Sequence, residues 1–375
     1  MTVCSMKSLL SGSFAGEWGS ESGETLTPVL RTANFNDDGS LDYGSPAYRC
    51  IPEKKVRAKR MRRGDIILEK SGGTPNRPVG IMAYYDSDDE ALCSNFNHVL
   101  RFDTDSVNPF FMFHQLRWLR EKGAFSPYTR KTTGLQNLQM KAFVDLELKV
   151  PAKAKQDGAA ATIRAIDLRR NELKKLLEKL DELVKSRFVE MFGELSESNY
   201  EGDTEQLSNL ADIVSGITKG RKVSAGMPLR EVPYMAVSNV KDGYIDWTKV
   251  KTIEATDAEI ERYRLEPYDV LMTEGGDPDK LGRGALLMEP PDDCIHQNHV
   301  FRVRIKDDRL KPEYFEYYLQ SPKAKDYFLS CAKRTTGIAT INKKQISSLP
   351  VIIPGIERQQ AFMAFVQQVD KLKFV

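Results

Sequence analysis

The sequence predicts an α+β protein in which two similar domains are joined by a long coiled-coil-type helix, with a second, shorter helix at the C-terminus. Three observations predict this fold class. Blocks of sequence recur in order, each copy mixes strand-like with helix-like patterning, and a Pro-free segment with heptad-like apolar spacing separates the copies. The expected divisions are a first domain at 1–152, a helical spacer at 153–196, a second domain at 197–355 and a helix at 356–375 that looks truncated beside the spacer.

The repeat consists of five pairs of blocks. Their offsets stay between 201 and 204 residues, so insertions between the copies are few. In sequence order, the first-copy blocks and their partners are ANFNDDGSLDY (33–43) with VSNVKDGYIDW (237–247), GDIILEKSGG (64–73) with YDVLMTEGGD (268–277), NHVLRF (97–102) with NHVFRV (298–303), NPFFMFHQLRWL (108–119) with KPEYFEYYLQSP (311–322), and RKTTGLQNLQMKAFVDLELKVP (130–151) with KRTTGIATINKKQISSLPVIIP (333–354). Two copies with so long a period exclude a solenoid.

Within each copy, short apolar runs before Gly-Gly predict strands, and the aromatic-rich blocks that follow a Pro predict helices. The NHVLRF and NHVFRV blocks place His98 and His299 at matched positions, where we expect structural roles. The second copy begins with QLSNLADIVSGITKGRK (206–222), and we expect the first copy to lack part of this lead-in.

The segment between the copies predicts one long helix over 152–193, ended by Gly193. Apolar residues recur at alternating steps of three and four, with one Arg among them, at 163, 166, 170, 173, 177, 180 and 184. Some 30 residues of helix would span roughly 45 Å. A surface helix packed on one domain is the alternative to a spacer.

Composition sets limits on the function. Lys and Arg nearly balance Asp and Glu, at a net charge of +2, so a nucleic-acid binder would need a local basic face. The five cysteines form no CxxC pair, which argues against a zinc site or a disulfide framework. No run is long enough for a membrane span and the N-terminus does not read as a signal peptide, so we expect a cytoplasmic protein.

These features together resemble the specificity (S) subunit of type I restriction-modification systems. The motifs that carry the resemblance are LEKSGGTPNRPVG (68–80), the two Thr-Thr-Gly blocks, LDELVKSRFVEMFG (180–193) and QQVDKLKFV (367–375). The resemblance implies two target-recognition domains, each reading one half of a split site in double-stranded DNA, and two helical regions paired as an antiparallel coiled coil. It implies a non-catalytic chain that binds no cofactor itself. Its partners would be DNA methylation (M) subunits and restriction (R) subunits, which carry S-adenosylmethionine, ATP and Mg.

Loops after the Gly-Gly turns are the first candidates for DNA contact. Arg and Lys suit guanine, Asn and Gln suit adenine, and Gly permits close approach of the backbone. The first copy offers Ser71, Gly72, Gly73, Thr74, Asn76 and Arg77, and the second offers Asp277, Lys280 and Arg283. The polar residues differ between the copies, as two readers of different half-sites require, although ordinary loop drift gives the same pattern.

The Thr-Thr-Gly blocks are the second candidates. Two cations beside Thr hydroxyls would suit phosphate, and the alternative is a plain turn in which Thr caps a helix. The residues are Arg130, Lys131, Thr132, Thr133, Lys333, Arg334, Thr335 and Thr336, to which Lys219 and Arg221 of the lead-in are added. The basic run KKVRAKRMRR (54–63) could follow phosphates or form a solvated face, and the second copy is acidic there.

Enzymatic functions fit less well. The D-x-E-x-K pattern of Asp145, Glu147 and Lys149 hints at a nuclease, but the second copy has Ser348, Pro350 and Ile352 there. The methyltransferase tetrad is approached only by 108–111, and the sequence contains no GxxxxGK[ST] phosphate loop. The remaining alternative is a two-domain scaffold that binds proteins through its helix.

Overall fold

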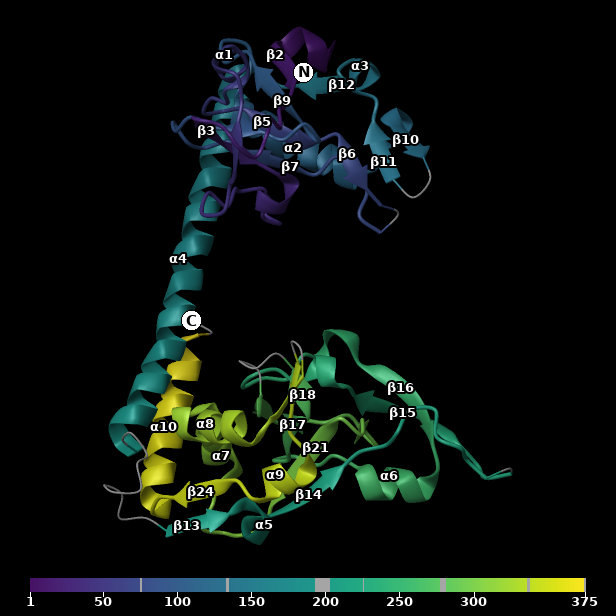
Figure 1. Ribbon diagram of the computed structural model, residues 1–375, viewed down its shortest axis with the longest axis vertical. Helices are drawn as coiled ribbons and strands as arrows, with labels where there is room; N and C mark the ends of the chain where they lie inside the picture. The colour runs from purple at the N-terminus through teal and green to yellow at the C-terminus, as the bar shows by residue number, and fades with distance from the viewer. Residues whose placement is uncertain are drawn as a thin grey trace. The chain divides into compact units, whose positions relative to one another are not determined.

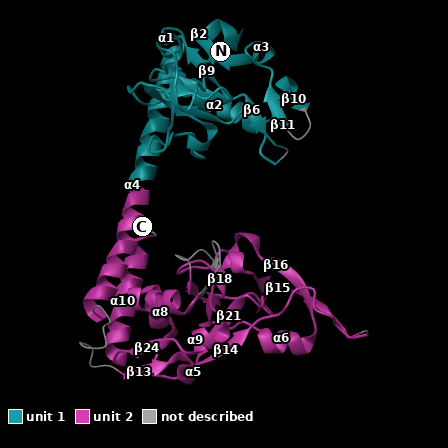
Figure 2. Cartoon of the chain, viewed as in Figure 1, with its two compact units in different colours: residues 1–172 teal, residues 173–375 magenta. Residues whose placement is uncertain are grey.

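The computed structural model describes residues 1–74, 76–132, 135–192, 203–224, 226–276, 281–335 and 338–373 (Figure 1). The chain divides into two compact units, Met1–Glu172 and Leu173–Val375, and the division falls inside one long helix (Figure 2). Each unit has a large hydrophobic core of its own, which is the requirement for an independently stable domain.

Unit 1 is built on a four-stranded antiparallel sheet in the order β2-β9-β5-β7. The strands are β2 (Leu10–Ala15), β9 (Asn97–Phe102), β5 (Ile66–Glu69) and β7 (Met82–Tyr84). All four residues of β5 are buried, because both faces of the sheet are covered. Ile66 and Leu68 point into a core that includes helix α2 (Pro109–Glu121), whereas Ile67 packs in a separate cluster on the other face.

Smaller elements surround this sheet. A second sheet has the order β4-β3-β8, and two further pairings are β1-β12 and β10-β11-β6. Their bounds are β3 (Leu26–Leu30), β4 (Ala47–Cys50), β8 (Leu92–Cys93), β1 (Thr2–Ser5), β12 (Glu147–Val150), β6 (Ser71–Gly73), β10 (Thr129–Thr132) and β11 (Leu135–Leu138), with short helices α1 (Glu53–Lys59), α3 (Met140–Phe143), η1 (Met6–Leu9), η2 (Thr32–Asn34) and η3 (Ser126–Tyr128).

Unit 2 repeats the plan with strands in the same order. Its four-stranded sheet is β14-β21-β17-β19, and the sheets β16-β15-β20, β13-β24 and β18-β23-β22 take the places of the smaller sheets in unit 1. The strands are β14 (Ala211–Ser215), β21 (Val300–Ile305), β17 (Val270–Thr273), β19 (Gly284–Leu286), β15 (Arg230–Met235), β16 (Lys251–Ala255), β20 (Ile295–His296), β13 (Asp203–Gln206), β24 (Pro350–Ile353), β18 (Gly275–Gly276), β22 (Lys333–Thr335) and β23 (Ile338–Thr340). The helices are α5 (Leu207–Leu210), α6 (Asp257–Tyr263), α7 (Pro312–Gln320), α8 (Pro322–Cys331), α9 (Lys343–Ser347), η4 (Val237–Asn239) and η5 (Trp247–Lys249). The predicted duplication of an α+β unit is confirmed.

The structure corrects the expectation about the start of the first copy. β1 pairs with β12 and is followed by η1 and β2, just as β13 pairs with β24 and is followed by α5 and β14. The first copy therefore has this part of the lead-in. Its residues had diverged too far for the sequence comparison to align them.

The strand register also corrects one block of the repeat. Ile66 and Leu100 are paired in unit 1, and their counterparts in unit 2 are Val270 and Val303. This register matches His98 with Phe301, so His98 and His299 are not equivalent, and the NHVLRF match was wrong by two residues. His98 bonds Ser13 at 2.8 Å, and burial lowers its pKa to about 4, which fits a structural residue.

Each copy ends in a helix that begins in the same way. Helix α4 (Lys153–Phe192) follows unit 1's last strand, and α10 (Ile356–Leu372) follows that of unit 2. In the first turn of α4 the buried Gln156 accepts from the Asn108 N–H at 3.0 Å and donates to the Pro151 carbonyl at 2.8 Å. Gln359 makes the same pair of bonds, with Lys311 at 2.9 Å and Pro354 at 2.7 Å. The two glutamines fix how each helix leaves its domain.

Within unit 2, the C-terminal half of α4 packs antiparallel to α10. Phe188 lies with its ring centroid 5.4 Å from that of Phe362, and the ammonium of Lys373 lies 2.8 Å from a carboxylate oxygen of Asp181. Phe188, near the end of α4, thus lies beside the start of α10, whereas Asp181, further back in α4, lies beside the end of α10. The prediction of a long helix between the domains and a paired C-terminal helix is confirmed.

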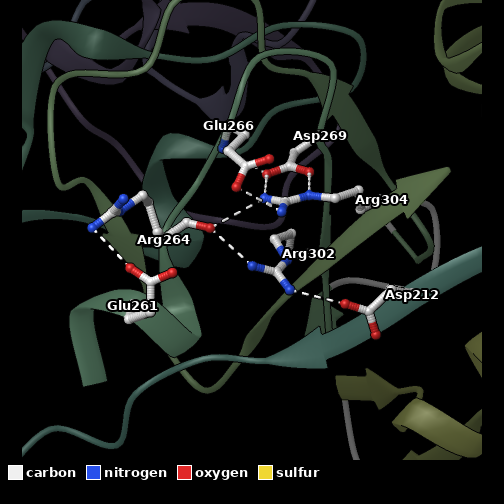
Figure 3. Close-up of polar contacts among 7 residues, drawn as sticks. All are labelled: Asp212, Glu261, Arg264, Glu266, Asp269, Arg302 and Arg304. Atoms are coloured by element: carbon white, nitrogen blue, oxygen red, sulfur yellow. Dashed lines mark hydrogen bonds and ion pairs between the residues drawn. The ribbon is translucent and has the colours of Figure 1, made fainter. Parts of the chain in front are cut away.

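A buried Asp–Arg pair recurs at matching positions of the two four-stranded sheets. Asp65 holds the Arg101 guanidinium with two bonds of 2.8 and 2.7 Å, and Asp269 holds that of Arg304 at 2.7 and 2.9 Å. Figure 3 shows the unit 2 network, in which Arg302 also reaches Asp212 and the Arg264 carbonyl. Both aspartates are 1% exposed, so each carboxylate depends on its arginine for compensation.

Candidate nucleic-acid interface

The two candidate segments of the first copy meet in one small sheet. Strand β6, which contains Ser71, Gly72 and Gly73, pairs with β11, and β11 pairs with β10, which contains Arg130 and Lys131 (Figure 1). Segments about sixty residues apart in the sequence therefore lie side by side. The sequence indicated each segment separately but gave no sign that they are neighbours.

The glycines of this sheet are required by its geometry. A Cβ on Gly73 would lie 2.3 Å from the backbone nitrogen of Val79, and Gly72 has a φ of +111°. Beyond them, Thr74 and Arg77 form a tight bridge in which the Thr74 N–H donates to the Arg77 carbonyl at 2.8 Å. This turn holds Asn76 and Arg77 at the surface, where both are exposed.

The guanidinium of Arg77 binds the carboxylate of a buried glutamate. Its Nη1 lies 3.2 Å from Oε1 of Glu69, a residue that is 2% exposed and whose other oxygen has no partner among the described residues. Burial raises the pKa of Glu69 despite the attraction of Arg77. A carboxylate that is only half satisfied can orient a guanidinium and leave its outer N–H groups free for another acceptor. Glu69 is a site residue that the sequence reasoning missed; its signal was an acid at the end of an otherwise apolar strand.

The first Thr-Thr-Gly block lies along the chain between the paired strands β10 and β11. Thr132 closes strand β10 and Leu135 opens β11, with Thr133 outside the described residues. The alternative in which these threonines cap a helix is wrong, because helix α3 is preceded by Gln139. Arg130 and Lys131 are exposed, and neither has an ion-pair partner in the part of unit 1 that the structure describes. They are available to an anion.

Unit 2 places its matching segments in the same arrangement. Strand β18 pairs with β23, and β23 pairs with β22, the strand of Lys333, Arg334 and Thr335. Asp277, Lys280 and Thr336 lie outside the described residues, and the side chains of Thr132, Lys333, Arg334 and Thr335 are likewise not described. Here too the helix that follows, α9, is capped by another residue, Asn342.

Two candidate arginines of the second copy are hydrogen-bonded to other residues of unit 2. Arg283 is partly buried, and its Nη2 lies 3.4 Å from the Val237 carbonyl. Arg221 donates to both carboxylate oxygens of Glu259, at 2.6 and 2.5 Å, and lowers the pKa of Glu259 to about 2. Lys219, two residues earlier, is exposed. Of the three, Lys219 is the one most open to a ligand.

Four of the seven cations in the basic run at 54–63 are in ion pairs: Lys55, Arg57, Lys59 and Arg63. Glu17 binds Lys55 and Lys59 at 3.2 and 2.9 Å. Arg63 binds Asp88 at 2.9 Å and also contacts Asp86. These pairs favour a structural, solvated face over a track of free cations.

Comparison with known proteins bears on this duplicated arrangement. The family described as "Type I restriction modification DNA specificity domain" matches residues 204–374. The EcoKI specificity subunit of Escherichia coli (strain K12) is 23% identical over 355 residues, which are 91% of this chain and 75% of that protein. The putative MjaX specificity subunit of Methanocaldococcus jannaschii is 25% identical over 182 residues, 48% of this chain and 42% of that protein. Residues 204–374 thus match a type I DNA specificity domain, and the chain is similar to a type I specificity subunit over 91% of its length.

Two solved structures share the fold of this chain. A chain from a study of complex assembly and conformational transition of the type I R-M system has a TM-score of 0.57 at 16% identity, covering 99% of this chain and 91% of that one. The type I S subunit of M. genitalium has a TM-score of 0.53 at 16% identity, covering 99% and 90%.

Among the described residues of the chain, no helix combines the length and apolarity that crossing a membrane demands. The same residues contain no group of three or more His, Cys, Asp or Glu side chains placed to hold a metal ion.

Proposed function

We propose that this chain is a type I specificity (S) subunit that recognises a bipartite site in double-stranded DNA, with one half-site read by each unit. The observation that carries this proposal is the duplicated edge in which a Gly-rich turn and a cationic hairpin share one three-stranded sheet. Backbone amides and cations can position such an edge on phosphates, and side chains of the turn can then reach base edges. The two turns differ in their polar residues, which suits two different half-sites.

The proposal gives the S subunit no catalytic step. Its work is to bring M subunits, which would bind S-adenosylmethionine, and R subunits, which would use ATP and Mg, to the chosen site in the cytoplasm. The matched positions Ser348, Pro350 and Ile352 leave the D-x-E-x-K pattern without a counterpart in unit 2. A nuclease motif confined to one of two duplicate units is not the basis of a shared function.

Selection from a random pool of DNA duplexes tests the proposal directly. With M subunits present, we expect enrichment of two short conserved blocks separated by an unspecific spacer of fixed length. Enrichment of a single continuous block would contradict reading by two units. A pool that shows no enrichment would favour a scaffold that acts through its helix.

Arg77 gives a sharper prediction within one half-site. Because Arg77 is exposed and its guanidinium is oriented by Glu69, we expect Arg77→Ala to relax one position of one half-site, at a cost of ~1–3 kcal/mol for the preferred base. The measurement is the selected motif together with the binding affinity for its single-base variants.

Arg57→Ala is the matched control, since it removes the same charge from an exposed residue of α1 outside the sheet. It should leave the motif unchanged. If Arg77→Ala weakens binding to all sequences equally, Arg77 contacts phosphate and does not read a base.

A further inference from the structure

Unit 2 contains a groove whose lining is rich in carboxylates. It encloses about 1030 Å³ and is bordered by the C-terminal half of α4, by α10, by α7 and by the segment that follows β19. Its acidic side chains are Asp181, Asp242, Glu289, Glu313, Glu316 and Asp370. Tyr244 and Trp247 also line it, and their side chains are 60% and 41% exposed. The groove is therefore both acidic and aromatic.

Three of the carboxylates already have cations. Lys373 lies 2.8 Å from Asp181 and 2.9 Å from Asp370, and Lys325 lies 3.1 Å from Asp242. Glu289, Glu313 and Glu316 have no cation partner within the described residues. Glu316 accepts one hydrogen bond, from the Leu286 N–H at 2.8 Å, and burial raises its pKa to about 7. Within the part of unit 2 that the structure describes, no Lys or Arg therefore balances these three glutamates.

Because the two units are duplicates, the residues that line this groove in unit 2 can be compared with those at the matching positions of unit 1. Because Gln156 and Gln359 make the same bonds, residues of α4 and α10 correspond at an offset of 203, as do those of α2 and α7. Arg164 of α4 therefore corresponds to Gln367 of α10, and Arg117 of α2 corresponds to Gln320 of α7.

In unit 1, the arginines Arg164 and Arg117 occupy the corresponding positions. The Arg164 guanidinium lies 4.2 Å from the ring centroid of Phe110, and Arg117 donates to the Asp37 carbonyl at 2.8 Å. In unit 2 both arginines are replaced by neutral amides. The matched rings change in the opposite sense, because Phe110 and Phe113 correspond to Glu313 and Glu316. Unit 2 therefore lacks these two arginines and has two more carboxylates in this place, although Lys185 and Lys373 also line the groove.

We propose that this groove of unit 2 binds an arginine side chain presented by a partner polypeptide. Glu313 and Glu316 supply acceptors for the planar, five-donor guanidinium, and the exposed faces of Tyr244 and Trp247 supply surfaces on which it stacks. The bound arginine takes the role in unit 2 that Arg164 has in unit 1. The partner is a protein, since carboxylates without cations repel the phosphates of DNA.

The probe is a defined peptide, acetyl-Ala-Leu-Arg-Leu-Ala-amide, titrated calorimetrically into the full-length S subunit. Its matched control carries citrulline in place of arginine, which keeps the shape and removes the charge. We expect the arginine peptide to bind at least tenfold more tightly than the citrulline peptide. Equal binding of the two peptides would overturn the proposal.

Variants of the S subunit locate the binding. Glu313→Gln combined with Glu316→Gln should weaken the arginine peptide at least tenfold. Asp292→Asn combined with Asp308→Asn likewise replaces two carboxylates by amides, at exposed residues outside the groove, and should have no effect. If both pairs of substitutions weaken binding alike, the attraction is a general effect of charge and the groove is not the site.

A third variant places an arginine in the groove as part of the chain itself. Gln367→Arg reproduces Arg164 and should abolish peptide binding while raising the melting temperature by about 2–4 °C. Peptide binding that survives this substitution would overturn the proposal. These measurements contain no DNA, so their outcome is independent of whether the S subunit reads a bipartite site.

Discussion

Inserting four residues after Leu177 should lengthen the unspecific spacer of the recognised site and leave both half-sites unchanged. Four residues add about 6 Å of helix and slightly more than one turn, so the register of the helix faces is nearly kept. An increase of one or two base pairs is expected, because DNA rises 3.4 Å per base pair. The measurement is the motif selected from a random duplex pool in the presence of M subunits.

The structure shows why this position is suitable. Residues 171–179 of α4 are all exposed. Arg170 makes the last ion pair to unit 1, with Asp38 at 3.3 Å, and Asp181 makes the first ion pair to α10. The insertion falls between these contacts and disturbs neither.

A matched control is the insertion of two residues at the same place. Two residues turn the following helix by about 200°, so this variant should lose binding to the split site, whereas the four-residue variant keeps it. Altered half-sites in the four-residue variant would contradict a helix that sets only the spacing.

Asp269→Ala should destabilise unit 2 by about 3–5 kcal/mol. The substitution leaves the Arg304 guanidinium, whose side chain is 19% exposed, without its two bonds to the carboxylate. It also removes the acceptor of the Glu266 N–H, which donates to Asp269 at 2.7 Å (Figure 3). For a unit of this size the melting temperature should fall by roughly 6–20 °C, as measured by calorimetry.

Glu261→Ala is the control for this prediction. Glu261 also binds an arginine in Figure 3, Arg264 at 3.0 Å, but its side chain is 76% exposed. An exposed pair three residues apart on a helix contributes less than about 1 kcal/mol, so the melting temperature should barely change. A similar loss in both variants would show that burial is not what makes the Asp269 pair important.

The hairpins of the Thr-Thr-Gly blocks mark the limit of sequence reasoning. The repetition of Thr132 and Thr335 at one offset revealed that the chain is duplicated, but it did not reveal whether they form a turn, a cap or a strand. The pairing of β10 with β11, and of β11 with β6, depends on a partner strand about sixty residues away. Local sequence carries no direct signal of such a partner.

Alignment by residue identity also misled at one place. NHVLRF and NHVFRV are nearly identical, yet the sheet aligns Val99 with Arg302, two residues away from that match. Backbone hydrogen bonds and the burial of alternate faces set the register of a strand, so a two-residue shift preserves the facing pattern while changing every partner.

The sequence by itself determined the duplication, the α+β class and the long helix, because each leaves a periodic or ordered trace along the chain. It also carried the resemblance to type I specificity subunits. Only the tertiary structure decided which residues share a site: that Glu69 holds Arg77, that Glu259 holds Arg221, and that unit 2 contains an acidic groove where unit 1 has Arg164. The physical reason is that ion pairs and hydrogen bonds act over a few ångströms in space. The folded chain brings together side chains that the sequence keeps tens or hundreds of residues apart.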